Sequence, residues 1–375
     1  MKNKHELEQI IRKNPQAVLI VNTHSRNGER LFFKALDLLQ LHGIEVIAAY
    51  PVRKPERIRS VVSEVISQKH PLIIIGGGDG TFNTIIDLFV HQDTVLGILP
   101  LGTANNFARS MGIPMSVHRA IEVIATGKVV DIDLGMINSQ YFINIATIGF
   151  SHNVVSATPR KLKRYLGMIS YLLCETQYLI SQELFRCIIT TDGREETIHT
   201  RQLIIANGSF YGARKITPDA HIDNDTLIIF AMDSESRWQG LKFWIGFFLG
   251  RHLTFPQSRI YKVKEATIET IPRKYVIMGG EKTTQTPAHL SIDNEAIQVI
   301  APQFFQDHDE EGCLQAGYPN ESFQKGSCSW KVSGQQPARG QYVLKYSSSP
   351  KFRVSGSLLP TPLEPFGSGE ELSPL

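Results

Sequence analysis

The sequence predicts an α/β N-terminal domain, doubly wound around a parallel sheet, followed by an all-β sandwich domain. Up to about residue 126, short β-branched runs alternate with segments whose apolar residues recur at helical spacing, as in a doubly wound sheet. After Thr126-Gly127-Lys128 the pattern changes to short strands separated by turns. From about Asp307 the chain becomes rich in Ser, Gly and Pro, without periodicity. We therefore expect one domain at 1–128, a second at 129–295, and a largely disordered tail at 307–375.

The expected elements of the first domain alternate regularly along the chain. The strands are Ala17–Val21, Ile44–Ala49, Leu72–Ile75 and Val95–Leu99. The helices are Glu6–Lys13, Glu29–Leu41, Pro55–Ser67 and a segment in which Phe82, Ile85, Ile86 and Phe89 recur. Ligands bind such sheets outside the carboxyl ends of the strands. The loops after the first, third and fourth strands are therefore expected to face one crevice.

The second domain is expected to consist of strands, with two helical interruptions. The strands are Val129–Leu134, Gln140–Ile148, Arg186–Thr191, Gln202–Asn207, Leu227–Met232, Ala266–Ile271 and Ala288–Ile292. The helices are Leu162–Ile180 and Trp238–Leu253, which carry apolar residues at helical spacing. This density of short strands favours a sandwich.

Composition and charge exclude several classes of protein. Of the 375 residues, 42% are hydrophobic and 20% are charged, which is ordinary for a soluble globular protein. The net charge of +3 is too small to indicate a nucleic-acid partner, and no apolar run approaches the ~18 residues that span a bilayer. The charged stretch Met1–Lys13 is unlike a signal peptide, and the four cysteines lack metal-site spacing or a disulfide framework. We therefore expect a reduced, cytoplasmic setting.

The most informative segment is the glycine loop Gly76-Gly77-Gly78-Asp79-Gly80-Thr81, between a buried strand and a helix. Consecutive glycines let the backbone approach a ligand and turn its N–H groups toward an anion at the helix N-terminus. The Asp79 carboxylate would repel a phosphate unless a cation such as Mg²⁺ binds both. The alternative is a tight turn with Asp79 as a structural cap. The loop differs from the dinucleotide fingerprint, because residue 81 is Thr, and from a Walker loop, because no Gly-Lys-Ser/Thr follows.

Polar turns also follow the first and fourth strands. The turn after the first strand contains Asn22, Ser25 and Arg26, whose side chains could bind an anion. The alternative is an ordinary βα loop with an Asn cap. The turn after the fourth strand reads Leu101-Gly102-Thr103-Ala104-Asn105-Asn106-Phe107-Ala108-Arg109.

The glycine loop and the segment Leu101–Arg109 together resemble the diacylglycerol kinase catalytic-domain family, in its bacterial lipid kinase branch, which is related to sphingosine and ceramide kinases. The resemblance covers about Ala17 to Ala301. It implies a nucleotide-binding domain like that of NAD kinases and phosphofructokinases, a sandwich domain for the lipid substrate, and a return strand at about 296–305. It also implies an ATP- and Mg²⁺-dependent kinase that transfers the γ-phosphoryl group to a lipid hydroxyl, diacylglycerol-like by default.

The resemblance assigns roles to the residues at matching positions. For ATP it implies Asn22, Ser25, Gly76, Gly77, Gly78, Asp79, Gly80, Thr81, Gly102, Thr103 and Asn105. For the catalytic Mg²⁺ it implies Asp79 and Asp133, and for catalysis it implies Asp293 as the base, with Glu295 and Asp79. A structural metal would lie near Asn224, in a loop that follows Asn207-Gly208 and Tyr211-Gly212.

Several positions depart from the family pattern. Arg26 stands where glycine is usual, Thr84 stands where Glu is frequent, and Asn294 replaces a glycine. Asn106 replaces an acidic residue near the metal, so we expect weaker Mg²⁺ binding rather than its loss. Asn224-Asp225 replaces Asp-Gly, so the structural metal is expected to be weak or missing.

Two other functions are compatible with the sequence. A kinase of NAD or another soluble nucleotide shares the glycine loop but not the segment Leu101–Asn106. A non-catalytic lipid- or nucleotide-binding protein of the same fold fits the neutral residues Asn106 and Asn294. The basic segment Arg160–Tyr165 suits peripheral contact with anionic lipid but also a solvated face, and Lys242–Leu249 is either buried or in contact with lipid. A homodimer is one option for the assembly.

Overall fold

The computed structural model describes residues 2–24, 28–149, 183–208, 210–211, 214–215, 222, 225–233, 236, 238–239, 242, 246, 255–279 and 281–306. The expected helix Leu162–Ile180, the basic segment Arg160–Tyr165 and the tail 307–375 lie outside these residues, as do most of Trp238–Leu253 and Lys242–Leu249. None of the described helices is long and apolar enough to cross a bilayer.

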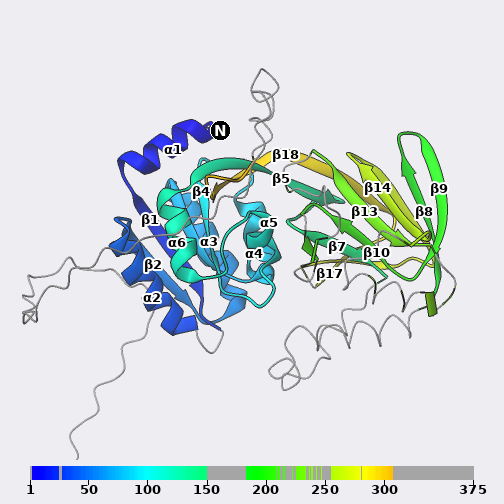
Figure 1. Ribbon diagram of the computed structural model, residues 1–375, viewed down its shortest axis with the longest axis horizontal. Coiled ribbons are helices and arrows are strands. Elements are labelled where there is room, and N and C mark those ends of the chain that lie inside the picture. Colours follow the sequence, from blue (N-terminus) through cyan, green and yellow to red (C-terminus); the bar gives the residue numbers. More distant parts are fainter. Residues whose placement is uncertain are drawn as a thin grey trace, which may run out of the picture.

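The first part of the chain forms a parallel sheet with helices around it, as expected (Figure 1). Strands β1 (Gln16–Asn22), β2 (Glu45–Val52), β3 (Leu72–Gly77) and β4 (Val95–Pro100) pair in parallel in the order β2-β1-β3-β4. Every residue of β3 and β4 is buried, which explains why these strands are continuous apolar runs rather than alternating ones.

The helices of this domain bury the apolar stripes that their sequences carry. α1 (Lys4–Lys13) begins with a capping box formed by Asn3 and Glu6. α2 (Gly28–Leu41) packs against α6 (Val117–Thr126), and α3 (Ile58–Ser67) packs against α4 (Asp79–Ile85). The shorter turns of helix are η1 (Pro55–Arg57), η2 (Ile86–Leu88) and α5 (Asn106–Ser110). α5 and α6 are additional to the expected helices.

One long strand, β18 (Ala288–Ala301), joins the two parts of the molecule. Near its end it pairs in parallel with β4, where Gln298 lies opposite Val95, and along most of its length it pairs antiparallel with β5 (Lys128–Ile137). Its beginning pairs with β15 (Ala266–Ile271) in the second domain. β5 and β18 therefore form a two-stranded ribbon that continues one ten-stranded sheet through both domains, as Figure 1 shows. The strand expected at Ala288–Ile292 and the return strand are one element.

The second domain is a sandwich, as expected. A six-stranded antiparallel sheet in the order β14-β13-β10-β7-β16-β17 packs against the part of the ten-stranded sheet that contains β15, β8 and β9. The remaining bounds are β6 (Gln140–Phe142), β7 (Ile145–Ile148), β8 (Phe185–Thr191), β9 (Arg194–Thr200), β10 (Leu203–Ala206), β11 (Phe210–Tyr211), β12 (Arg214–Lys215), β13 (Leu227–Met232), β14 (Ser258–Val263), β16 (Tyr275–Met278) and β17 (Glu281–Gln285). Its core is a separate cluster that combines residues of both sheets, such as Ile205 and Ile268.

One expected strand of this domain is wrong. The segment Gln140–Ile148 is not continuous, because β6 pairs with β5 in one sheet whereas β7 pairs with β10 in the other. The chain changes sheets at Ile143-Asn144, between the two short strands. This break places Asn144 at the boundary between the two domains, next to the glycine loop.

Candidate active site

The glycine loop connects the buried strand β3 to the uncapped start of α4. Gly78 is the N-cap residue, and within the described residues no side chain caps this helix. The N–H groups of Thr81 and Phe82 donate to the Gly78 carbonyl at 2.9 and 3.2 Å. Since Gly78 and Gly80 line a cleft, the first turn of α4 presents backbone N–H groups at its wall.

The segment after β4 supports the glycine loop from behind. Gly78 and Gly102 lie so close that a Cβ on Gly78 would be 2.9 Å from Gly102 Cα. Asn105, which is 7% exposed and has φ +50°, accepts the Gly102 N–H at 2.8 Å and donates to the Gly102 carbonyl at 3.0 Å. The side-chain amide of Asn105 therefore stabilises the turn Gly102–Asn105, in which Gly102 and Thr103 are exposed. The role of Asn105 in ATP binding stays a prediction.

The first polar turn also meets the glycine loop. Asn22 Nδ2 donates to Thr81 Oγ1 at 3.0 Å, and Asn22 Oδ1 accepts the His24 N–H at 3.2 Å. Ser25 lies outside the described residues. Gly76 and Gly77 are buried in β3, where a Cβ on Gly77 would be 2.6 Å from Thr81 Cβ, so they allow close packing rather than line the cleft.

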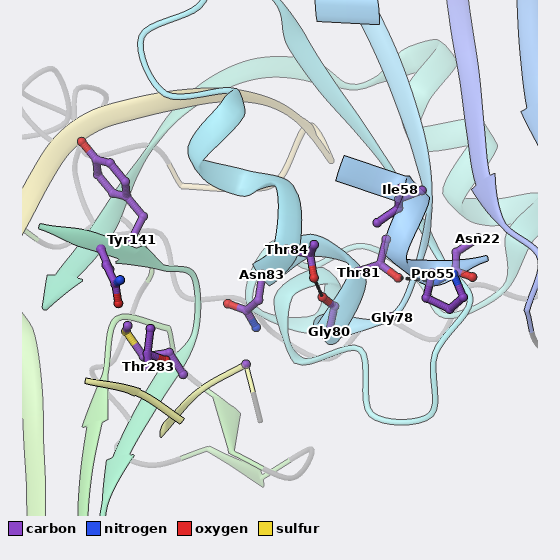
Figure 2. A pocket seen from close by; sticks show the side chains of 13 residues that line it. Asn22, Pro55, Ile58, Gly78, Gly80, Thr81, Asn83, Thr84, Tyr141 and Thr283 are labelled. Atoms are coloured by element: carbon purple, nitrogen blue, oxygen red, sulfur yellow. Dashed lines mark hydrogen bonds between the residues drawn. The ribbon is translucent and has the colours of Figure 1, made fainter. Parts of the chain in front are cut away.

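The cleft has a volume of about 640 Å³, which is ordinary for a small-molecule site. Both domains contribute its walls: the lining residues are Asn22, Pro55, Ile58, Gly78, Gly80, Thr81, Asn83, Thr84, Gln140, Tyr141, Met278, Gly279 and Thr283. Figure 2 shows the glycine loop on one side and Tyr141, which comes from β6, on the other. Thr84, one of the departures noted above, donates its hydroxyl to the Gly80 carbonyl at 2.8 Å.

Asp79 lies beside a group of buried oxygens that have no partner. Its Oδ1 accepts the Phe107 N–H at 3.0 Å and lies 3.5 Å from Asn144 Nδ2, while its Oδ2 has no partner among the described residues. Within the same part of the chain, Ser110 Oγ, Asn144 Oδ1 and Asn207 Oδ1 are buried without hydrogen bonds. Two of them converge, because a Cβ on Gly208 would be 2.9 Å from both Ser110 Oγ and Asn144 Oδ1. Carboxylate, amide and hydroxyl oxygens are ligands that fit Mg²⁺.

Sequence reasoning missed Ser110 and Asn144 in this group. Asn144 was hidden inside an expected strand, although Asn is unfavourable in strand interiors and so could have suggested the break. Asn106, the departure from an acidic residue, is buried at the start of α5 beside Phe107. Asn224 lies outside the described residues, so the structural metal stays a prediction.

Asp133 does not open onto the cleft. It is 1% exposed, and its two carboxylate oxygens accept the backbone N–H groups of Glu295 and Asp225, each at 3.0 Å. Among the described residues, Asp79, Asp133 and Asp293 do not bring their carboxylates within 4.8 Å of one another as a group of three. In this geometry Asp133 anchors the chain around Glu295, and its role as a Mg²⁺ ligand stays a prediction.

The anchored segment is a bulge in β18. Asp293 lies opposite Leu134, and Ile297 lies opposite Ile132. The three residues 294–296 of β18 therefore stand opposite a single residue of β5, Asp133. Glu295, in the middle of the bulge, has φ +50° and an exposed side chain. Bulges of this kind redirect a side chain next to a functional site.

The bulge directs Asp293 toward Tyr141. The Tyr141 hydroxyl donates to Asp293 Oδ2 at 2.7 Å, and His91 Nε2 lies 3.2 Å from the same oxygen. The backbone of His91 is held next to the bulge, because its N–H donates to the Ala296 carbonyl at 2.9 Å. Burial, together with the hydrogen bond to Asp293, raises the pKa of Tyr141 to about 12. Asp293 Oδ1 has no partner among the described residues.

Tyr141 thus connects Asp293 to the cleft. It lines the cleft with its ring, and in Figure 2 its hydroxyl points away from the glycine loop toward β18. Neither Tyr141 nor His91 was singled out from the sequence. The start of α4 thus lines the cleft, Asp79 and the buried oxygens near it lie next to the lining residues Gly78 and Gly80, and Asp293 lies behind Tyr141.

Comparison with known proteins gives consistent matches over both domains. A family model described as "Diacylglycerol kinase catalytic domain" matches residues 16–137, and one described as "YegS C-terminal NAD kinase beta sandwich-like domain" matches residues 145–301. The "Probable lipid kinase YegS-like" of Klebsiella pneumoniae is 35% identical over 222 residues, which cover 57% of this chain and 72% of that protein. A Staphylococcus saprophyticus protein named diacylglycerol kinase is 27% identical over 296 residues, covering 76% of this chain and 95% of its own length. The fold resembles a solved diacylglycerol kinase structure from Bacillus anthracis, with a TM-score of 0.61, 23% identity, and coverage of 78% of this chain and 98% of that one.

Proposed function

The chain belongs to the family of diacylglycerol kinase catalytic domains, and from its cleft we propose an ATP- and Mg²⁺-dependent lipid kinase. The enzyme transfers the γ-phosphoryl group of ATP to a lipid hydroxyl, with a diacylglycerol-like lipid as the default acceptor. One observation carries the proposal: a single cleft extends from the uncapped glycine loop to Tyr141, and Tyr141 holds Asp293.

The glycine loop binds the phosphates of ATP in this proposal. Gly78 and Gly80 line the cleft where α4 begins, and a Cβ on Gly80 would meet nothing within 4 Å, so the backbone there is open to a ligand. The N–H groups of the first helical turn and the helix dipole favour an anion at this place. Asn22 contributes by holding Thr81 at the rim of the loop.

Asp79 and the oxygens near it would hold the cation. Mg²⁺ bound there would neutralise negative charge on the phosphates during transfer. Asp79 Oδ1 is fixed by the Phe107 N–H, so Oδ2 is the atom left to face a metal or its water. The orphaned oxygens of Asn144 and Ser110 can accept hydrogen bonds from metal-bound water.

Asp293 is the general base in this proposal. Its Oδ1 takes the proton of the lipid hydroxyl, whose oxygen forms the new bond to phosphorus as the bond to ADP breaks. Tyr141 and His91 both contact Oδ2, which leaves Oδ1 oriented and available. Asp133 contributes without contacting the substrate, because it stabilises the bulge in β18 that orients Asp293.

Membrane contact and assembly extend the proposal. A diacylglycerol-like acceptor lies in a bilayer, so we propose that the protein binds peripherally to anionic membranes. The test is sedimentation with two kinds of vesicle, one that contains an anionic lipid and one that lacks it. If the same amount of protein stays in the supernatant with both kinds, the proposal is contradicted. A homodimer is the assembly we propose, which light scattering checks directly.

The test of the function is a substrate panel. Purified protein with labelled ATP and Mg²⁺ is incubated with diacylglycerol and other hydroxyl lipids in mixed micelles, and in parallel with NAD. We expect label in a lipid and none in NAD. Label in NAD would favour a soluble-nucleotide kinase, and binding of ATP without any transfer would favour a non-catalytic binding protein.

A further inference from the structure

Two histidines and a glutamate meet where the end of α2 packs against α6. His42 directly follows α2, while His118 and Glu122 lie four residues apart on α6 and so share one face of that helix. One ligand atom from each of the three lies within 4.8 Å of the other two. Among the described residues no other set of three or more His, Cys, Asp or Glu is gathered in this way. We propose that this cluster is a Zn²⁺ site.

The distances fit a small tetrahedral ion. His118 Nδ1 lies 3.2 Å from Glu122 Oε1, and the His42 and His118 rings meet edge to face with centroids 5.8 Å apart. Zinc bonds of about 2.0–2.2 Å in tetrahedral geometry place neighbouring donor atoms roughly 3.3–3.5 Å apart. The His118 and Glu122 donors, at 3.2 Å, are within about 0.1 Å of this spacing. The His42 donor reaches it with a side-chain movement of about 1.5 Å at most.

His42 itself lacks a partner. Its Nε2 is buried and makes no hydrogen bond within the described part of the chain. Buried polar atoms in folded proteins are nearly always paired, so this nitrogen indicates a missing ligand. The backbone around it is fixed, because the His42 N–H donates to the Leu38 carbonyl and Gly43, at φ +79°, ends the helix. The backbone that carries the imidazole is therefore fixed, and the side chain alone adjusts when an ion binds.

The donor set selects the kind of metal. Two imidazole nitrogens and one carboxylate oxygen form a set that binds Zn²⁺ and leaves the fourth position to water. Mg²⁺ and Ca²⁺ prefer sites made entirely of oxygen ligands, as found around Asp79. The zinc cluster is also far from the cleft. The polar turn that contains Asn22 lies near the start of α2, and His42 follows the end of this helix, which has 14 residues and a length of about 21 Å. The zinc site is thus separate from the cleft.

An ion at this place would join two elements that are distant along the chain. It would tie the end of α2 to α6 and so stabilise the N-terminal domain. An ion that binds only the folded protein raises the melting temperature with concentration. We expect a rise of about 5 °C when free Zn²⁺ is one hundred times its dissociation constant.

The experiment measures zinc affinity and melting temperature without ATP or Mg²⁺, so its outcome is independent of kinase activity. Full-length protein is freed of metal with a chelator and then titrated with Zn²⁺ in competition with a chromophoric chelator. The same titration is made with His42→Ala, His118→Ala and Glu122→Gln, and with His5→Ala, which removes an exposed histidine of α1, as the matched control. Since His118 is exposed, its variant tests the site even if the His42 variant folds poorly.

We expect one Zn²⁺ per chain, a loss of affinity of more than tenfold in each site variant, and parent-like binding in the control. The zinc-dependent rise in melting temperature should disappear in the same variants. Equal zinc affinity in the parent and in the His118→Ala variant would place the ion elsewhere and overturn the proposal. Absence of zinc binding by the parent would leave His118 and Glu122 as an ordinary surface ion pair.

Discussion

Replacing Tyr141 by phenylalanine removes one hydroxyl near Asp293 and leaves the aromatic ring in the wall of the cleft. The lost hydrogen bond is 2.7 Å long and ends on a carboxylate oxygen. Hydrogen bonds to charged groups are worth about 1.5–3 kcal/mol. His91 Nε2 still lies 3.2 Å from the same oxygen and retains part of the orientation, so we take the lower value. At about 1.4 kcal/mol for each factor of ten, Tyr141→Phe should lower kcat about tenfold.

The assay distinguishes a loss of the correct orientation of Asp293 from a loss of ATP binding. Initial rates with varied ATP give kcat and KM, and we expect the KM for ATP to change less than about twofold, because the Tyr141 hydroxyl points away from the glycine loop, where we propose that the phosphates bind (Figure 2). Since the pKa of Tyr141 is raised to about 12, its hydroxyl keeps its proton at any pH used for such assays. The loss should therefore be the same at neutral and mildly alkaline pH. Tyr261→Phe, on the far edge strand β14, is the matched control.

A second comparison would refute the reasoning directly. If Tyr141 acts through Asp293, then Tyr141→Phe should have no further effect in an enzyme that already carries Asp293→Asn. Additive losses would mean that Tyr141 acts on the substrate or on the shape of the cleft. An unchanged kcat in the single variant would mean that Asp293 does not need this contact.

Four other substitutions test the cation site, the base and Glu295 beside it. Asp79→Ala should abolish transfer and lower the free energy of unfolding by about 1 kcal/mol, because the Phe107 N–H loses its acceptor; substantial activity would contradict the metal role. Asn106→Asp restores an acidic residue and should lower the Mg²⁺ concentration for half-maximal rate, whereas an unchanged or higher requirement would remove position 106 from the metal site. Asp293→Asn should lower kcat by about 10²–10⁴-fold while ATP affinity, measured by calorimetry, stays within a few-fold; an equal loss of ATP binding would assign Asp293 to the scaffold. Glu295→Gln should have a smaller effect, because its side chain is exposed and its backbone holds the bulge.

The centre of the parallel sheet was predictable because β1, β3 and β4 are buried on both faces. Ile73 to Ile75 and Leu96 to Leu99 are continuous apolar runs bounded by turns, so their assignment needs no knowledge of the partner strand. Edge strands lack this signal. β9 is mostly exposed and carries Arg194, Glu195 and Glu196, and its pairing with β8 appears only in the folded molecule.

The site was predictable only where its chemistry is local. The glycine loop combines strand, turn and helix start within a few residues, so its approach to an anion can be read from the sequence. The contacts of Asp293 cannot, because Tyr141 is 152 positions away along the chain and the bulge that directs it depends on the buried carboxylate of Asp133. The contacts of the Asp133 carboxylate with the backbone N–H groups of Glu295 and Asp225 likewise join distant parts of the chain, so matching residues to a family pattern does not reveal them.

The ribbon of β5 and β18 has a consequence for how the protein is made. The parallel sheet gains its last strand from residues near Gln298, which pair with Val95 some 200 positions earlier. A chain emerging from the ribosome therefore exposes one edge of β4 until almost the entire folded region has been synthesised. Such long-range pairing slows folding and leaves a strand edge open to wrong partners. Production of the N-terminal half alone should yield aggregates, and slower translation before residue 288 should lengthen the time during which nascent chains need a chaperone.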